Sequence, residues 1–153
     1  MNKYEEKLKA FMRDNAINGE HLVFDKPCRS VEEAAEAIQG SPGDFIKSIC
    51  MVDTQDQMIV AIVKGEDRAS TSRVAKALNI ERPRIATPEE VLKAGYPVGG
   101  VPPFGFEAVF LIDPHVMEQD AVYGGGGSEH SLVKIAPEEL RKANNGRMVR
   151  VRK

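Results

Sequence analysis

Ten residues of the sequence, Tyr96 to Gly105, combine three glycines with three prolines. Neither residue type suits a helix or an ordinary paired strand, because proline lacks the main-chain N–H and glycine has no side chain to pack. Glycine lets a ligand approach the main chain closely, and proline restricts the loop to few shapes. The chemistry that this stretch can supply is hydrogen bonding from its own backbone. A plain surface turn is the alternative, since clusters of these residues usually mark loops.

Lys47 is the second candidate, because it lies inside an apolar segment. The run from Phe45 to Val52 is rich in branched and aromatic residues and predicts a strand. Alternation along that strand places Lys47 on the same face as Phe45, Ile49 and Met51. An unpaired buried ammonium group is unfavourable. The lysine therefore either projects into a cleft towards a polar or anionic ligand or extends its amine into water.

A second glycine-rich stretch, Gly124 to Gly127, precedes Ser128 and His130. A phosphate-binding P-loop would need a lysine and a Ser or Thr at the start of a helix, and neither that spacing nor the following β-like segment fits. Four glycines either offer backbone donors to a ligand or form a flexible hairpin tip. Ser128 and His130 suggest a hydrolytic pair, but no third partner completes it.

The C-terminal tail is the third candidate, as a patch that contacts phosphates. No acidic residue lies between its six basic residues, whereas the whole chain has a net charge of only −2. Solvated charge on an edge strand is the alternative. The residues concerned are Arg141, Lys142, Arg147, Arg150, Arg152 and Lys153.

The composition is that of an ordinary globular protein, with 42% hydrophobic and 29% charged residues in 153. This length fits one domain, residues 1–153, with a substantial core. A net charge of −2 argues against a surface that binds nucleic acid everywhere. No apolar run approaches the roughly 18 residues that a membrane helix needs, and residues 1–6 do not resemble a signal sequence. We therefore expect a cytoplasmic protein without a membrane partner.

Cys28 and Cys50 are the only cysteines. They form neither a C-x-x-C pair nor a zinc-like grouping with the three histidines. Structural roles fit both cysteines, so no metal or other cofactor is expected.

Short helices and strands must position these residues. Apolar spacing predicts a first helix from Lys3 to Asn15, and Ser30 with Glu33 makes a capping box for the second. The other predicted strands are His21–Phe24, Met58–Val63, Arg84–Ala86, Ala108–Ile112, Ser131–Ile135 and Met148–Val151; further helices run from Thr71 or Ser72 to Leu78, from Thr87 to Gly95, and from Pro137. Without a regular βαβ repeat, this order predicts a mixed α/β (α+β) fold, with a curled mixed sheet or a barrel surrounded by short helices.

Four segments together resemble one known family. They are Phe45-Ile46-Lys47-Ser48, Gly95 to Gly105, Leu111-Ile112-Asp113 and the glycine-rich loop before Ser131. Along nearly its whole length the chain is similar to the YbaK family of aminoacyl-tRNA deacylases, also called prolyl-tRNA synthetase-associated editing domains. The most specific part of the resemblance is Gly99-x-x-x-Pro103 together with the earlier strand lysine.

The resemblance implies a barrel-like α/β domain that acts in trans, without a cofactor, to hydrolyse amino acids wrongly attached to tRNA. Its implied partners are an aminoacyl-tRNA and a prolyl-tRNA synthetase or another synthetase, with no DNA. By position, the catalytic residues are Lys47, Gly99 and Gly100. The implied substrate contacts are Val101, Pro102, Pro103, Gly126, Gly127, Ser128 and His130, and the residues expected to bind RNA are Arg147, Arg150 and Arg152.

The mechanism implied by the family relies on the substrate, whose terminal ribose hydroxyl or side chain assists the reaction. We hypothesise that the N–H groups of Gly99 and Gly100 face the scissile carbonyl or the ribose, where fixed donors would stabilise a developing oxyanion. Lys47 would hold the substrate or a nearby phosphate.

Leu132 departs from the family pattern, because the family's Cys-tRNA deacylases carry an acidic residue at this position. Ser128-Glu129-His130 also replaces their basic pair and glycine. The edited amino acid therefore stays open among Ala, Cys, Ser, Thr and non-protein amino acids, with tRNA(Pro) as one candidate carrier. Two other functions also stay open: a non-catalytic tRNA- or nucleotide-binding module of this fold, and a serine hydrolase that uses Ser128 and His130.

Overall fold

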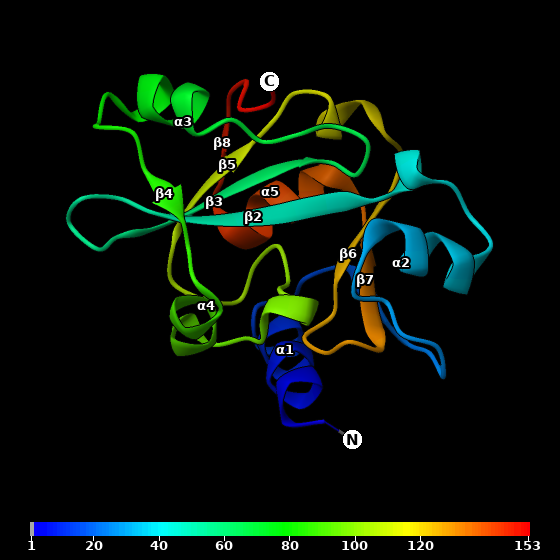
Figure 1. The fold of residues 1–153 in the computed structure, drawn as a ribbon. Helices are drawn as coiled ribbons and strands as arrows, with labels where there is room; N and C mark the ends of the chain where they lie inside the picture. Colours follow the sequence, from blue (N-terminus) through cyan, green and yellow to red (C-terminus); the bar gives the residue numbers. More distant parts are fainter. Residues whose placement is uncertain (1) are drawn as a thin grey trace.

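The computed structural model describes residues 2–153 as two β-sheets with helices around them (Figure 1). One sheet has five strands in the order β4-β2-β3-β5-β8, and the other has three in the order β1-β7-β6. The strands are β1 (Gly19–Val23), β2 (Ile46–Val52), β3 (Met58–Lys64), β4 (Arg84–Ile85), β5 (Val109–Ile112), β6 (Val122–Gly125), β7 (Ser131–Ile135) and β8 (Arg147–Met148). The predicted mixed α/β class is confirmed. No closed barrel is found among these residues, so that alternative is not confirmed.

The cap predicted at Ser30 is present, and other helices also start at side-chain caps. The Ser30 hydroxyl accepts a hydrogen bond from the Glu33 N–H at 3.1 Å, and Thr87 and Glu90 form a reciprocal capping box. The helices are α1 (Lys3–Asp14), α2 (Val31–Ile38), α3 (Thr71–Leu78), α4 (Pro88–Ala94) and α5 (Pro137–Asn144), and the 3-10 turns are η1 (Pro42–Asp44), η2 (Val98–Gly100) and η3 (Val116–Glu118). Across residues 2–153, no helix is both long enough and apolar enough to cross a membrane.

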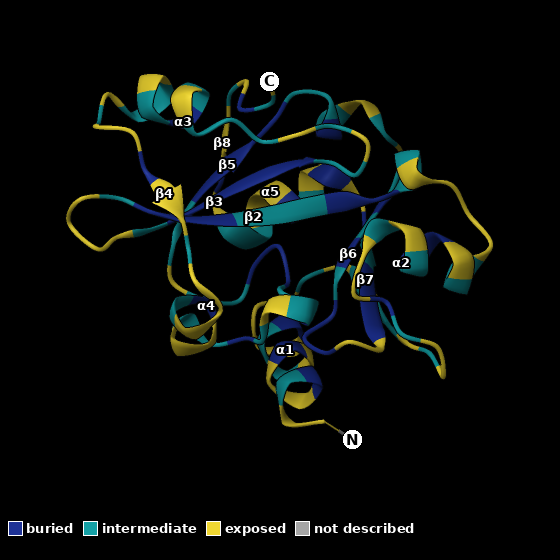
Figure 2. Cartoon of the chain, in the orientation of Figure 1, coloured by how far each residue is buried: buried dark blue, intermediate teal, exposed yellow. Residues whose placement is uncertain are grey.

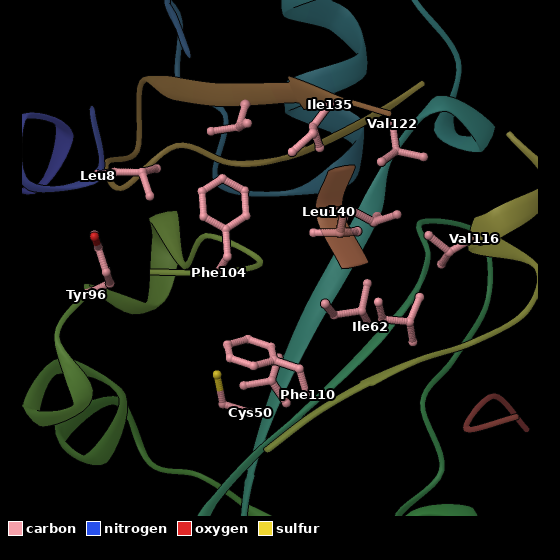
Figure 3. Close-up of a cluster of buried hydrophobic side chains, with 14 of the residues drawn as sticks. Leu8, Cys50, Ile62, Tyr96, Phe104, Phe110, Val116, Val122, Ile135 and Leu140 are labelled. Atoms are coloured by element: carbon pink, nitrogen blue, oxygen red, sulfur yellow. The ribbon is translucent and has the colours of Figure 1, made fainter. Parts of the chain in front are cut away.

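The larger sheet is buried on both faces. Along β3, Val60 and Ile62 join a core that also contains residues of the second sheet, α1 and α5, whereas Ile59 and Ala61 join a core under α3. The first of these cores is drawn in Figure 3, where Phe104 and Leu140 lie near its centre. A strand that alternates between two cores has no polar face, which explains the unbroken apolar run of β3.

The edge of β2 is only partly covered. β2 pairs with β3 along its whole length, but β4 pairs only with Met51 and Val52. Residues 46–49 therefore have no strand of the same sheet beside them on the side away from β3. Within this part of β2, residues 47–49 are intermediate in burial, whereas β3 is mostly buried (Figure 2).

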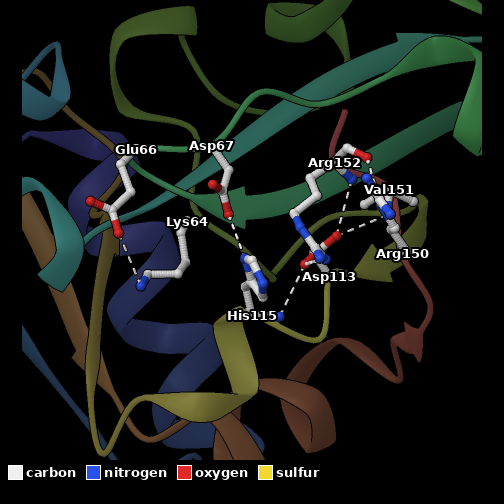
Figure 4. A network of polar contacts seen from close by, with 8 residues as sticks. All are labelled: Lys64, Glu66, Asp67, Asp113, His115, Arg150, Val151 and Arg152. Atoms are coloured by element: carbon white, nitrogen blue, oxygen red, sulfur yellow. Dashed lines mark hydrogen bonds and ion pairs between the residues drawn. The ribbon is translucent and has the colours of Figure 1, made fainter.

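Asp113 fastens the C-terminal end of the chain to the larger sheet (Figure 4). Its fully buried carboxylate accepts hydrogen bonds from the N–H groups of Val151 and Arg152, both at 3.0 Å, and from the Arg152 guanidinium at 2.9 Å. Burial alone would raise the pKa of Asp113, but hydrogen bonds from the main chain of His115, Arg152 and Val151 and from the Arg152 side chain outweigh it. The pKa therefore lies below its usual value.

Candidate functional site

A pocket of about 410 Å³ opens at the uncovered edge of β2. Its walls come from β2, from the N-terminal end of α2, from η2 and the residue after it, and from the facing parts of β6 and β7. In Figure 1 these segments lie around one half of β2, with η2 as the yellow-green turn above α1. The pocket thus brings Lys47 together with both glycine-rich stretches of the sequence.

Lys47 lines this pocket and is half-buried. No residue in 2–153 forms a hydrogen bond or ion pair with its side chain. Lys64 on the neighbouring strand differs, because its amine lies 3.1 Å from a carboxylate oxygen of Glu66. Lys47 is therefore a cation without a protein counter-ion, available to a phosphate or to an electron-rich oxygen of a ligand.

Two main-chain N–H groups of the first glycine stretch are not used by the fold. The N–H of Gly100 donates to the Pro97 carbonyl at 3.0 Å and closes the η2 turn. Gly99 and Val101 also line the pocket, and their N–H groups have no hydrogen-bond partner within residues 2–153. The structure thus differs from the expectation that Gly100 donates to the substrate, since the turn already uses that N–H. The available donors are those of Gly99 and Val101.

Gly100 instead allows the two glycine stretches to touch. A Cβ atom at this position would lie 2.5 Å from the Ser128 nitrogen and 2.7 Å from the Gly127 carbonyl carbon. The Gly127 N–H donates to the Gly100 carbonyl at 2.8 Å. A Cβ at Gly125 would likewise overlap the Val101 carbonyl oxygen. Glycine is required at both positions because two main chains approach each other closely.

The second glycine stretch divides into two halves with different positions. Gly124 and Gly125 belong to β6 and line the pocket. Gly126 and Gly127 lie outside it and hold the loop in place. The Gly126 carbonyl is 2.8 Å from the Nε2 atom of His21, and its N–H donates to the Ser131 carbonyl at 3.1 Å.

Ser128 and His130 do not form a hydrolytic pair. The Ser128 hydroxyl is buried and hydrogen-bonds to Glu5 and Ser131, whereas the His130 side chain is exposed. The hydrogen bond between the two residues comes from the His130 main-chain N–H, at 3.2 Å from the Ser128 oxygen. Neither residue lines the pocket. The serine-hydrolase alternative is therefore contradicted, because the hydroxyl has no imidazole base and no access to the pocket.

Pro102 and Pro103 are buried behind the first glycine stretch and do not line the pocket. A Cβ at Gly124 would lie 3.1 Å from the Pro103 ring, and the Pro103 carbonyl accepts a hydrogen bond from the Asn144 amide at 3.0 Å. Both prolines thus support the loop from the core side, although the resemblance implied substrate contacts for them.

Part of the pocket wall is largely apolar, and no local pattern in the sequence marks most of it as a binding surface. Leu132 lines it together with Cys28, Ala34, Phe45 and Tyr123. Burial raises the pKa of the Cys28 thiol, and the Glu33 carboxylate adds to this effect. The thiol therefore stays protonated near neutral pH and is a poor nucleophile.

Arg29 lies at the same pocket and is also a residue that sequence analysis missed. Its guanidinium forms an ion pair with Glu33 at 3.1 Å. The Gly99 position lies beside its stem, because a Cβ there would be 3.5 Å from the Arg29 Cγ atom. The Ser30 capping signal does locate the start of α2, but nothing local in the sequence indicates that this helix end faces Lys47.

The basic C-terminal tail lies away from the pocket. Its strand, β8, forms one edge of the larger sheet and is separated from β2 by β5 and β3. Arg152 is paired with Asp113, and the Arg147 guanidinium donates to the Ala77 carbonyl at 2.8 Å. Arg147 and Arg150 are exposed. A nucleic acid that reached this tail would contact it away from the pocket. As for metals, no group of three or more His, Cys, Asp or Glu side chains in the described chain is placed to hold an ion.

Fold and site together define a small α/β protein whose pocket presents main-chain donors and an unpaired lysine. The chain belongs to the aminoacyl-tRNA editing domain family, whose model matches residues 25–143. The family resemblance found in the sequence is thereby confirmed.

Relatives of two kinds are similar to this chain. The uncharacterized protein YwhH of Bacillus subtilis is 28% identical over 120 residues, which are 76% of each chain. A proline–tRNA ligase of Pseudothermotoga lettingae is 28% identical over 92 residues, which are 60% of this chain and 16% of the ligase. The chain therefore corresponds to a small part of the ligase.

Two solved structures share the fold. The hypothetical protein APE2540 has a TM-score of 0.88 and 28% identity, covering 96% of this chain and 99% of its own. A candidate trans-editing enzyme for prolyl tRNA synthetase has a TM-score of 0.91 and 22% identity, covering 100% of this chain and 99% of its own. At that identity the second likeness shows the fold alone.

Proposed function

We propose that this protein hydrolyses the ester bond of a mischarged aminoacyl-tRNA that a separate synthetase has produced. The observation that carries the proposal is the pocket itself, where unpaired Lys47 lies with the free N–H groups of Gly99 and Val101. Membership of the aminoacyl-tRNA editing domain family supports the choice of substrate class.

The chemistry fits a site that positions its substrate and supplies few reacting groups. Water attacks the ester carbonyl carbon, the carbon–oxygen bond to the ribose breaks, and the ribose oxygen takes up a proton. The N–H groups of Gly99 and Val101 stabilise the oxyanion of the tetrahedral intermediate, a kind of contact whose loss elsewhere costs about 10²–10³ in kcat. The neighbouring ribose hydroxyl assists the water, since an ester is already activated and correct placement supplies much of the rate.

Lys47 has the role of an electrostatic clamp in this proposal. A half-buried ammonium group without a protein partner attracts the terminal phosphate or the ester oxygens. It therefore helps to hold the carbonyl oxygen against the two N–H donors.

The apolar wall indicates the class of amino acid. Leu132, Ala34 and Phe45 provide no hydrogen-bonding side chain for a thiol or hydroxyl group of the substrate. A small apolar side chain such as that of alanine suits this wall better than cysteine or serine. Discrimination of this kind is worth about 1–3 kcal/mol.

tRNA(Pro) is the proposed carrier because the matched relatives include proline–tRNA ligases. A prolyl-tRNA synthetase is accordingly the proposed source of the mischarged substrate. Arg147 and Arg150, which are exposed, are the proposed contacts to the body of the tRNA.

A deacylation panel tests the proposal. tRNA(Pro) charged with Ala, Cys or Ser is incubated with the protein, and the released amino acid is measured alongside tRNA binding at low and high salt. We expect release from at least one substrate, with Ala-tRNA(Pro) fastest. Salt-sensitive binding without release from any substrate would instead indicate the non-catalytic binding module.

A further inference from the structure

A buried carboxylate on α1 reaches the second glycine stretch, 123 positions along the chain. Glu5 is only 5% exposed, and the Ser128 hydroxyl donates to it at 2.5 Å. The same hydroxyl lies 2.7 Å from the Ser131 hydroxyl and accepts from the His130 N–H at 3.2 Å. A hydroxyl has one donor and two acceptor sites. With Glu5 as its acceptor and two donors around it, the Ser128 hydroxyl is fully satisfied and held in one orientation.

This fixed position is transmitted to the first glycine stretch. The residue beside Ser128, Gly127, donates its N–H to the Gly100 carbonyl. The Gly100 α-carbon is packed directly against the Ser128 main chain, where no room is left for a methyl group. Any displacement of Ser128 therefore displaces Gly100, and with it the flanking N–H groups of Gly99 and Val101.

The same helix also contacts the start of the first glycine stretch. The Lys7 amine donates to the Gly95 carbonyl at 3.1 Å and lies 4.5 Å from the centre of the Tyr96 ring. At the second stretch, a Cβ on Gly127 would lie 2.8 Å from the Tyr4 carbonyl oxygen. The first two turns of α1 thus contact both glycine stretches, although α1 lies outside residues 25–143, which the family model matches.

We propose that Glu5 is a positioning residue for the deacylation: through Ser128 and Gly127 it fixes the N–H donors of Gly99 and Val101 in the pocket. The expected effect of Glu5 on the deacylation rate rests on the proposed function, whereas its effect on the position of the two loops does not. Glu5 itself does not line the pocket, so it acts on the substrate only through the loops.

The test compares Glu5→Ala, Glu5→Gln and Ser128→Ala with Glu6→Ala, an exposed neighbour on the same helix. Amide hydrogen exchange is followed at the hydrogen-bonded N–H groups of Gly100, Gly126 and Gly127 and in the β2–β3 pair, and deacylation kinetics are measured in parallel. For Glu5→Ala we expect exchange in the two loops to be about tenfold faster, with β2 and β3 unchanged. We expect kcat to fall about tenfold while KM stays within about twofold, because misplaced donors weaken the transition state more than binding.

The conservative variant Glu5→Gln distinguishes a loss of loop positioning from a general loss of stability. Glu5→Gln keeps an oxygen that accepts from Ser128 and should recover most of the loss, whereas Ser128→Ala should reproduce Glu5→Ala. Unchanged loop exchange in Glu5→Ala would overturn the proposal, and so would equal acceleration throughout β2 and β3. If the wild type released no amino acid from any tRNA, the proposed function would fail, while loop exchange would still decide whether Glu5 fixes the loops.

Discussion

Gly99 and Gly100 are adjacent in the sequence, but the structure gives them different surroundings. At Gly99 a Cβ would meet the Cγ atom of the flexible Glu129 side chain at 3.1 Å, whereas at Gly100 it would meet the Ser128 main chain at 2.5 Å. A side chain can move aside more easily than two paired main chains. The family resemblance implied catalytic roles for both glycines. The surroundings leave the Gly99 N–H free for the proposed donor role, whereas Gly100 packs against another main chain.

We therefore predict that Gly100→Ala reduces deacylation at least about tenfold and destabilises the fold by about 1–3 kcal/mol. Gly99→Ala should stay within about threefold of wild-type activity, since its N–H remains. Urea unfolding and initial deacylation rates measure both effects. Equal activities of the two variants would contradict the distinction.

The position of Leu132 on the pocket wall leads to a prediction about amino acid specificity. It is 3% exposed and lies on the pocket wall beside Phe45 and Ala34. Leu132→Ala should enlarge the apolar end of the pocket and raise the rate for a larger amino acid relative to alanine by about tenfold. The measurement is a competition between Ala-tRNA(Pro) and the same tRNA charged with valine. An unchanged ratio would mean that the amino acid side chain does not reach this wall.

At the scale of elements, helices and strands followed from local patterns. Branched and aromatic content located β2, and an unbroken apolar run located β3, each to within one residue at each end. The predicted cap at Ser30 located the start of α2. β6 was harder, because it extends through Gly124 and Gly125, two residues of low strand preference whose neighbours require the absence of a side chain. β8 comprises Arg147–Met148 and so begins one residue earlier than predicted and ends sooner. The final residues are instead held by Asp113.

The Asp113 contact predicts how stability depends on pH. Its pKa is lowered in the folded protein, so its contribution is present above the unfolded pKa of about 3.9 and is lost as the pH falls through the folded value. Asp113→Asn should be less stable than wild type by about 2–3 kcal/mol at pH 7, because charged hydrogen bonds are lost. Unfolding free energies measured at pH 7 and in steps below pH 4 should show this gap closing on acidification. A gap that stays constant with pH would contradict the role of the ionised carboxylate.

At the scale of the whole molecule, the pocket is a product of long-range packing. Lys47, Gly99 and Leu132 come from separate parts of the chain and meet at an edge of β2 that β4 leaves uncovered. Nothing in their local sequence encodes this meeting, and the same holds for Glu5 and Ser128. The sequence could therefore nominate Lys47 and the glycine stretches individually, and the family resemblance linked them. The apolar wall, the two free N–H groups and the α1 contacts required the three-dimensional arrangement.

In the proposed function, unpaired Lys47 and the main-chain donors of the same pocket promote hydrolysis of a mischarged aminoacyl-tRNA. The most direct measurement is single-turnover deacylation by Lys47→Ala, compared with Lys64→Ala as a strand lysine that is paired with Glu66 and lies outside the pocket. We predict that Lys47→Ala slows release at least about tenfold, equivalent to about 1.4 kcal/mol of transition-state stabilisation, while Lys64→Ala matches the wild type. Full activity of Lys47→Ala on every substrate that the wild type hydrolyses would contradict this role of Lys47.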